Sequence, residues 1–193
     1  MIHNQDCILY LVRHGATENN LADPPVLQGR GIDGPLASVG IEQAESAERA
    51  LAGFAIDRIY SSPLRRARQT AELIARPHGL DVTTVDEITE VDVGQWEGGS
   101  WKHIQANEPD AYRQFVEFPD TVGYKQGESL NQVRDRTVPA LMSLLETNLS
   151  RRIVVVAHNV VNRVFVAHAL GLPMREARTL AQDNCGQHLS LSK

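Results

Sequence analysis

The sequence predicts an α/β fold, a three-layer sandwich in which helices flank a mostly parallel central sheet. Short apolar runs without polar alternation recur along the chain, as expected of strands that are covered on both faces. Segments with apolar residues at helical spacing lie between these runs, and strands that alternate with helices favour a parallel sheet. No repeat, low-complexity tract or linker interrupts the pattern, so we expect a single domain over residues 1–193.

The strands are expected at four apolar runs. In chain order these are Cys7 to Val12, Ile59 to Ser61, Val82 to Val85 and Ile153 to Ala157. The first and last runs are rich in β-branched and aliphatic residues, which favours strands buried on both faces. A short final strand is expected near His188 to Leu191.

Four helices are expected where apolar residues recur every three or four positions. The first begins near Ser38, which is expected to cap it, and the last ends near Gly171. The apolar positions, helix by helix, are Ile41, Ala44, Ala47 and Leu51; Leu64, Ala67, Ala71 and Ile74; Val133, Thr137, Leu141 and Leu144; and Val160, Val164 and Ala167.

Residues 86–127 differ in character from the rest of the chain. This stretch holds both tryptophans together with scattered glycine and proline residues. We expect it to form an insertion over the edge of the sheet. Because specificity usually comes from loop side chains, we expect this insertion to select the substrate.

Composition excludes several classes of function. A net charge of -5 and the lack of a long basic run argue against nucleic-acid binding. No apolar run approaches the roughly 20 residues that span a bilayer, and the polar start of the chain does not resemble a signal peptide. Two cysteines are too few for a disulfide framework or a zinc site. We therefore expect a soluble cytoplasmic protein.

Polar clusters follow three of the expected strands. They are Arg13-His14-Gly15, Ser61 to Arg66 and His158-Asn159. Because the carboxyl ends of parallel strands share one edge of an open sheet, we expect these clusters to converge. Two of them also open a helix, whose first amide groups and dipole favour an anion. Arginine donors suit phosphate oxygens, so the sequence predicts a site for a phosphate dianion.

Several motifs resemble those of the histidine phosphatase superfamily, which contains cofactor-dependent phosphoglycerate mutases and related phosphatases. The segment Leu11 to Thr17 is similar to the family's RHG signature. Further matches follow in the family's order along nearly the whole chain: Asn20; Gln28-Gly29, Asp33, Leu36, Gly40 and Gln43-Ala44; Ser61 to Ala67 with Thr70-Ala71; Glu90, Gly94 and Trp96-Glu97-Gly98; Gly127-Glu128-Ser129; and Val156-Ala157-His158. A single tripeptide arises often by chance, whereas this ordered series is specific.

The resemblance implies a role for each matched residue. His14 is the expected nucleophile, and Glu90 is the expected proton donor. The residues expected to bind phosphate are Arg13, Asn20, Arg66 and His158. The residues expected to contact the rest of the substrate are Gln28, Gly29 and Asn159.

Spacing alone leaves three of these assignments open. Arg65 competes with Arg66, and alignment with the family's motif selects Arg66. The carboxylates that compete with Glu90 are Asp86, Glu87, Asp92 and Glu97. Motif register favours Glu90 among them. His158 could instead be a core histidine that closes an apolar strand, whereas His168 on the following helix is interpreted as structural.

These residues predict a phosphomonoesterase that hydrolyses a small phosphorylated metabolite through a phosphohistidine on His14. Positive neighbours keep the His14 ring neutral, so that a nitrogen lone pair can attack phosphorus. Fixed arginine and histidine donors can stabilise the transition state, so neither a metal nor another cofactor is expected.

Two other functions fit part of the pattern. One is phosphoryl transfer of the phosphoglycerate mutase type, and the other is a non-catalytic phospholigand-binding domain. Val91 follows Glu90 where the mutases of the family place an arginine, which favours hydrolysis. Ala16 and Asn159 also depart from the family pattern, which often has glutamate and glycine there, and they are expected to reshape the mouth of the pocket. The oligomeric state is left open.

Overall fold

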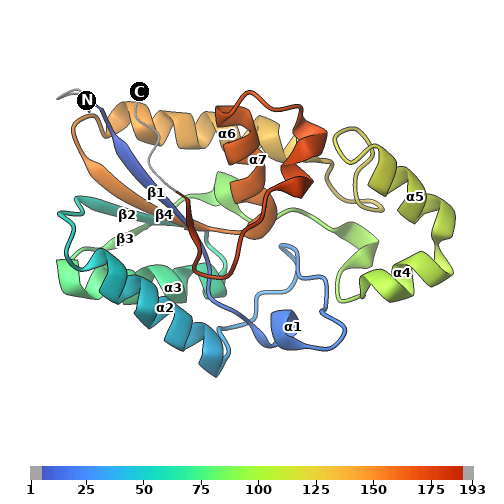
Figure 1. Cartoon of the computed structure of the whole chain (residues 1–193), viewed down its shortest axis with the longest axis horizontal. Coiled ribbons are helices and arrows are strands. Elements are labelled where there is room, and N and C mark those ends of the chain that lie inside the picture. The colour runs from blue at the N-terminus through green and yellow to red at the C-terminus, as the bar shows by residue number, and fades with distance from the viewer. Residues whose placement is uncertain (1–5, 189–193) are drawn as a thin grey trace.

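The computed structural model describes residues 6–188, which contain a five-stranded sheet (Figure 1). Across the sheet the strands are β3 (Val82–Thr84), β2 (Arg58–Ser61), β4 (Arg152–Ala157), β1 (Ile8–Arg13) and β5 (Gln187–His188). The first four are parallel, and β5 pairs antiparallel with β1. The central strands β1 and β4 are almost entirely buried, as their apolar runs predicted.

Helices lie on both faces of this sheet. The α-helices are α1 (Glu18–Leu21), α2 (Ser38–Leu51), α3 (Arg65–Ala75), α4 (Trp101–Asn107), α5 (Pro109–Glu117), α6 (Leu130–Thr147) and α7 (Asn159–Ala169). The 3₁₀ helices are η1 (Arg76–His78), η2 (Asp86–Ile88), η3 (Gly94–Trp96) and η4 (Met174–Thr179). In the part of the chain that is described, no helix is long and apolar enough to cross a membrane.

Two hydrophobic clusters show which helices cover which face. Leu11 and Val12 are neighbours on β1, so their side chains point to opposite faces of the sheet. Val12 packs in a cluster with Ile74 of α3, and α2 contributes to the same cluster. Leu11 packs in the other cluster with Leu141 of α6 and Phe165 of α7. The predicted three-layer α/β sandwich is therefore confirmed (Figure 1).

Helix α2 packs differently from the sequence expectation. Its N-cap is Ala37, which makes no side-chain capping bond, whereas Ser38 is already the first helical residue. Ile41 is 41% exposed, and Gly40 lies on the buried face in its place. The reason is a close approach between backbones, because a Cβ on Gly40 would lie 2.0 Å from the carbonyl oxygen of Ala16. This contact brings α2 against the loop that follows β1.

The remaining expected elements occur with small shifts. Helix α3 buries the predicted apolar stripe. On α6 the buried residue is Leu145 and not its neighbour Leu144, and on α7 Val161 is fully buried whereas Val160 is only half-buried. Of the expected last strand, the structure shows His188 paired within β5. Residues 189–191 lie outside the described part of the chain.

Residues 86–127 include α4 and α5, which lie beyond the carboxyl ends of the parallel strands (Figure 1). Their aromatic side chains pack on one another. The rings of Trp101 and Phe115 stack at a centroid distance of 5.5 Å, and Phe115 lies 4.5 Å from the ring of Tyr124. This cluster forms an apolar wall on the side of the molecule where the strands end.

Candidate active site

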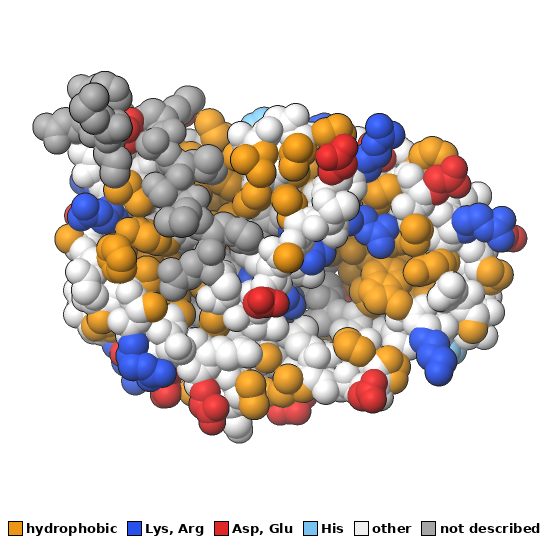
Figure 2. Space-filling view, viewed as in Figure 1, with side chains coloured by type: hydrophobic (Ala, Val, Ile, Leu, Met, Phe, Trp, Pro, Cys, Tyr) orange, Lys and Arg blue, Asp and Glu red, His pale blue; other side chains and the backbone are white. Residues whose placement is uncertain are grey.

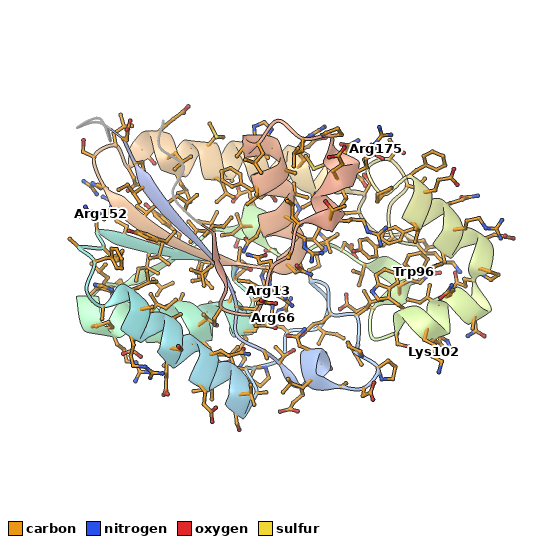
Figure 3. All side chains as sticks on the ribbon, viewed as in Figure 1. Arg13, Arg66, Trp96, Lys102, Arg152 and Arg175 are labelled. Atoms are coloured by element: carbon orange, nitrogen blue, oxygen red, sulfur yellow. The ribbon has the colours of Figure 1, made fainter. Side chains whose placement is uncertain are left out.

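The three polar clusters converge where β1, β2 and β4 end. The backbone amide of His14 donates to the carbonyl of Ala157 over 3.1 Å, and that of Ser62 donates to the carbonyl of Val156 over 3.0 Å. These bonds join the end of β4 to the segments that follow β1 and β2. Figure 3 shows Arg13 and Arg66 at this point, where the sheet meets the start of α3.

His14 is buried, and its ring is fixed by two neighbours. Nδ1 lies 2.7 Å from the carbonyl oxygen of Gly15, which can only accept, so Nδ1 carries the proton of the neutral ring. Nε2 therefore keeps its lone pair, and the Nε of Arg66 donates to it over 3.3 Å. Burial, followed by the charge of Arg66, lowers the pKa of His14 well below its usual value. A neutral imidazole with an unprotonated Nε2 is able to attack phosphorus.

Arg66 and His158 lie next to the His14 ring. Arg66 is fully buried, and its terminal nitrogens donate to two backbone carbonyls of the loop 29–32, at 2.8 and 2.9 Å. The Nε2 of His158 lies 2.7 Å from the Oγ of Ser62, and its ring centroid is 5.1 Å from that of His14. The structure thus brings both residues to the predicted nucleophile, but neither lines the cavity in front of it.

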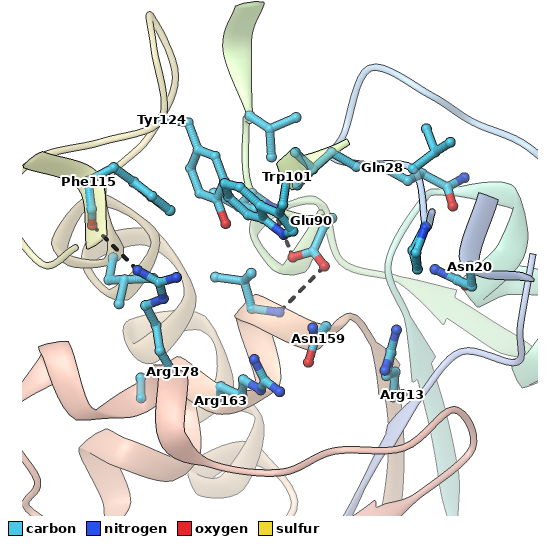
Figure 4. Close-up of a pocket in the computed structure, with 18 of the residues that line it drawn as sticks. Arg13, Asn20, Gln28, Glu90, Trp101, Phe115, Tyr124, Asn159, Arg163 and Arg178 are labelled. Atoms are coloured by element: carbon cyan, nitrogen blue, oxygen red, sulfur yellow. Dashed lines mark hydrogen bonds between the residues drawn. The ribbon is translucent and has the colours of Figure 1, made fainter. Parts of the chain in front are cut away.

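A cavity of about 290 Å³ opens beside His14 (Figure 4). The predicted site residues that line it are Arg13, His14, Asn20, Gln28, Glu90 and Asn159. Figure 2 shows its mouth as a hollow near the middle of this face, with apolar side chains on the α5 side and basic groups on the other. Gly29 does not line it. A Cβ at Gly29 would lie 2.6 Å from the carbonyl oxygen of Val91, so a glycine permits close packing in the wall.

The predicted phosphate ligands at the His14 end of the cavity are held by backbone groups. Arg13 donates from Nη1 to the carbonyl of Gln182 over 2.8 Å, and its Nε has no partner among the described residues. The Oδ1 of Asn20 accepts from the backbone amide of Thr17 over 3.0 Å. Figure 4 shows the amide nitrogen of Asn20 turned toward the cavity. Both side chains therefore keep donor groups available for an anion.

Glu90 is the buried carboxylate of the cavity. Its Oε1 accepts from the amide of Val91 over 2.9 Å, and its Oε2 accepts from the amide of Val160, in the first turn of α7, over 3.4 Å. Burial raises the pKa of Glu90, although these amides and the nearby Arg66 oppose the shift. A carboxyl group in this environment can hold a proton and later release it.

Burial and contacts differ between the candidates that spacing left open for the Arg66 and Glu90 positions. Arg65 is exposed, whereas Arg66 lies beside His14. Asp92 pairs with Arg30 at 2.6 Å. The other competing carboxylates are the exposed Asp86 and Glu87, and Glu97, which accepts from the amides of Gly29 and Gly31. Within residues 6–188, no group of three or more His, Cys, Asp or Glu side chains could hold a metal ion.

A family model described as the histidine phosphatase superfamily, branch 1, matches residues 9–189. This chain belongs to the histidine phosphatase superfamily. Phosphoserine phosphatase 1 of Hydrogenobacter thermophilus is 34% identical over 177 residues, which cover 91% of this chain and 82% of that protein. The probable phosphoglycerate mutase GpmB of Salmonella choleraesuis is 34% identical over 177 residues, which cover 92% of this chain and 81% of that protein.

A solved structure supports the same assignment. Phosphoserine phosphatase from Entamoeba histolytica, in complex with 3-phosphoglyceric acid, matches this fold with a TM-score of 0.84 at 27% identity. The match covers 96% of this chain and 94% of the other. The predicted family is therefore confirmed, and the protein is a histidine-type phosphoryl-transfer enzyme of the phosphatase and phosphoglycerate mutase group.

The cavity has further lining residues that the sequence analysis missed. They include Trp101, Phe115, Tyr124, Arg163 and Arg178. Arg163 lies four residues after Asn159 on α7, so helical spacing could have placed both on one face. Tyr124 lies in a loop and Arg178 in a 3₁₀ helix, where no periodic pattern signals the direction of a side chain.

Proposed function

We propose that this protein is a phosphomonoesterase that hydrolyses a small phosphate ester through a phosphohistidine on His14. The observation that carries the proposal is the state of two groups in one cavity. His14 has an unprotonated Nε2, and Glu90 has a raised pKa that favours its protonated form. Transfer of a phosphoryl group from an alkyl ester to a histidine requires an unprotonated ring nitrogen together with a proton for the leaving oxygen.

In the first proposed step, His14 Nε2 bonds to phosphorus while the bond from phosphorus to the ester oxygen breaks. Glu90 gives its proton to that oxygen, and the alcohol leaves. Arg13 and Asn20 offer donors to the phosphoryl oxygens from the cavity wall. The bond from Arg66 Nε to His14 Nε2 must be given up when Nε2 binds phosphorus, which frees that donor for a phosphoryl oxygen.

In the second proposed step, the Glu90 carboxylate takes a proton from water. The water oxygen bonds to phosphorus, and the bond from phosphorus to Nε2 breaks. Phosphate leaves, His14 returns to its neutral form, and Glu90 is again protonated. His158 is proposed to stabilise the negative charge from beside the His14 ring, since its Nδ1 has no partner among the described residues.

Hydrolysis is favoured over isomerisation by the residue beside Glu90. Val91 is 2% exposed and lines the cavity as an apolar side chain, in the position where the family's mutases place an arginine. Incubation with 3-phosphoglycerate distinguishes the two reactions. We expect release of inorganic phosphate, and exchange between phosphoglycerate isomers without phosphate release would overturn this choice.

The assigned nucleophile is tested with two histidine variants on a chromogenic phosphate ester. His14→Ala is expected to lower phosphate release on the order of 10⁴-fold or more, because the attacking atom is lost. His168→Ala removes an exposed imidazole from α7 and is expected to keep the wild-type rate. Equal rates for the wild type and His14→Ala would show that another group attacks phosphorus, or that the activity has another source.

We further propose that residues 1–193 form one histidine phosphatase domain, in which about residues 86–127 select the substrate. The support is that this segment supplies Trp101, Phe115 and Tyr124 to the cavity wall. The substrate is proposed to be a small phosphorylated metabolite, because the cavity is about 290 Å³. A cytoplasmic location is proposed because the two cysteines, Cys7 and Cys185, are free thiols, which suits a reducing compartment.

A further inference from the structure

The cavity concentrates positive charge in a chain with a net charge of -5. Among the described residues, its lining has the basic residues Arg13, Arg163 and Arg178 and a single carboxylate, Glu90. Figure 4 shows Arg178 at the opposite end of the cavity from Arg13, with Arg163 between them. One arginine therefore stands at the proposed phosphate position, and two more stand farther from it.

In the described part of the chain, these two farther arginines have no carboxylate at ion-pair distance, although the charge of Glu90 acts on Arg163. Among the described residues, neither Arg163 nor Arg178 forms an ion pair with a carboxylate. The Nε of Arg163 is buried and has no hydrogen-bond partner there. Arg178 donates to the carbonyl of Phe115 over 3.4 Å, and its guanidinium lies 4.8 Å from the centre of that ring. Because partly buried charges usually have partners, this pair has unused capacity for an anion.

The surroundings of the pair suit a charged ligand group. Stacked Trp101 and Phe115 form an apolar wall, and a low-dielectric wall strengthens the attraction between opposite charges. Figure 4 shows the hydroxyl of Tyr124 directed into the cavity between Arg178 and Glu90. Burial raises the pKa of Tyr124, so the hydroxyl stays protonated and can donate a hydrogen bond.

We propose that Arg163 and Arg178 form a second anion site that selects phosphate esters bearing a carboxylate. The inference rests on the proposed phosphatase activity and specifies its substrate class. Guanidinium groups bind carboxylates through paired hydrogen bonds, and the Tyr124 hydroxyl supplies a third donor group. Glu90 lies between this site and the phosphate end, where it meets the ester oxygen that joins the two parts of the substrate.

A pair of substrates that differ only in the second anion tests this proposal. 3-Phosphoglycerate and glycerol 3-phosphate, matched in configuration at C2, carry a carboxylate and a hydroxymethyl group at the same place. For the wild type, kcat/KM is expected to be about ten- to a hundredfold higher for 3-phosphoglycerate, the range that hydrogen bonds to a charged group provide. Equal values for the two esters would overturn the second anion site while leaving the phosphatase activity in place.

Arginine variants locate the source of the preference. Arg163→Met and Arg178→Met are each expected to reduce the ratio of the two kcat/KM values about tenfold, chiefly by raising KM for 3-phosphoglycerate. Arg163→Lys keeps the charge and should retain part of the ratio. Arg175→Met removes an exposed arginine from η4 and should leave the ratio unchanged (Figure 3). Because the ratio is measured within one protein, partial misfolding does not change it.

The possible failures are separable. If wild-type protein releases phosphate from neither ester nor from a chromogenic ester, the proposed phosphatase function is wrong and this inference falls with it. If the Met variants lose activity on both esters in equal proportion, the two arginines do not bind the carboxylate. The proposal of a second anion site is then wrong, whereas the proposed hydrolysis is unaffected.

Discussion

At the scale of single residues, burial sets the protonation states that the proposed reaction needs. It lowers the pKa of His14 and raises that of Glu90, because both charged forms lose their hydration. Burial therefore favours a free lone pair on the nucleophile and a bound proton on the acid. Arg66 adds to the effect on His14 and opposes that on Glu90, so burial is the factor that acts in the required direction on both groups.

The buried histidines predict how stability depends on pH. His14 and His158 have pKa values well below the usual 6.5, with burial as the main cause. In the unfolded chain both rings regain ordinary pKa values, so the unfolded state binds protons first as the pH falls. The free energy of unfolding should therefore decrease below about pH 6.5, by up to about 1.4 kcal/mol per pH unit for each histidine, until the folded pKa is reached.

Urea unfolding at a series of pH values measures this dependence. His14→Ala removes one of the two groups and should give a shallower fall in the free energy of unfolding, whereas His168→Ala should follow the wild type. Glu90, whose raised pKa acts in the opposite direction, is present in all three proteins. If the wild type showed no loss of stability as the pH dropped below the ordinary histidine pKa, the buried rings would have to be protonated or accessible in the folded state.

At the scale of elements, the contact between α2 and the loop after β1 positions the nucleophile. A Cβ on Gly15 would lie 2.3 Å from the carbonyl oxygen of Gly40, and one on Gly40 would lie 2.0 Å from that of Ala16. Gly40→Ala is therefore expected to displace the loop next to His14, to lower the free energy of unfolding by about 1–3 kcal/mol and to reduce phosphate release.

Gly53→Ala is the matched control for this substitution, because nothing lies within 4 Å of a Cβ at that position. It should leave both the stability and the rate close to those of the wild type. Chemical denaturation and initial rates of phosphate release give the two readouts. Closely similar results for the two variants would mean that the loop tolerates an added methyl group and that the contact does not hold His14 in place.

The same contact shows why the buried face of a helix was harder to predict than the presence of the helix itself. Apolar runs without alternation predicted β1 and β4, since burial of both strand faces leaves a signal in the sequence itself. The predicted buried face of α2 was wrong at Ile41. The rotation of this helix depends on the close approach between the backbones of Gly40 and Ala16, which are distant in the sequence. Hydrophobic periodicity contains no information about such a contact.

At the scale of the whole molecule, topology explains which part of the site could be predicted. The strand order places β4 between β1 and β2, so residues that follow these strands must meet at one edge. That rule predicted that the segments holding His14, Arg66 and His158 meet, whereas the choice of Arg66 over Arg65 came from the resemblance to the family's motif. Arg178 and Tyr124 could not be predicted, because their directions depend on how η4 and the segment 86–127 fold over the ends of the strands.

The central claim is most directly tested by identifying the phosphorylated atom. Glu90→Gln lacks the base of the second step, which should slow hydrolysis of the phosphoenzyme by roughly 10²–10⁴-fold. A chromogenic ester still phosphorylates this variant, because its leaving group needs little protonation. Glu87→Gln, a change of an exposed carboxylate, should not accumulate phosphoenzyme.

Peptide mass spectrometry and phosphorus NMR of the trapped Glu90→Gln protein then locate the phosphoryl group. The structure predicts an acid-labile, alkali-stable phosphoryl group on Nε2 of His14, since Nδ1 is occupied by its bond to the carbonyl of Gly15. A phosphoryl group on Nδ1 or on any other residue would contradict the proposed mechanism.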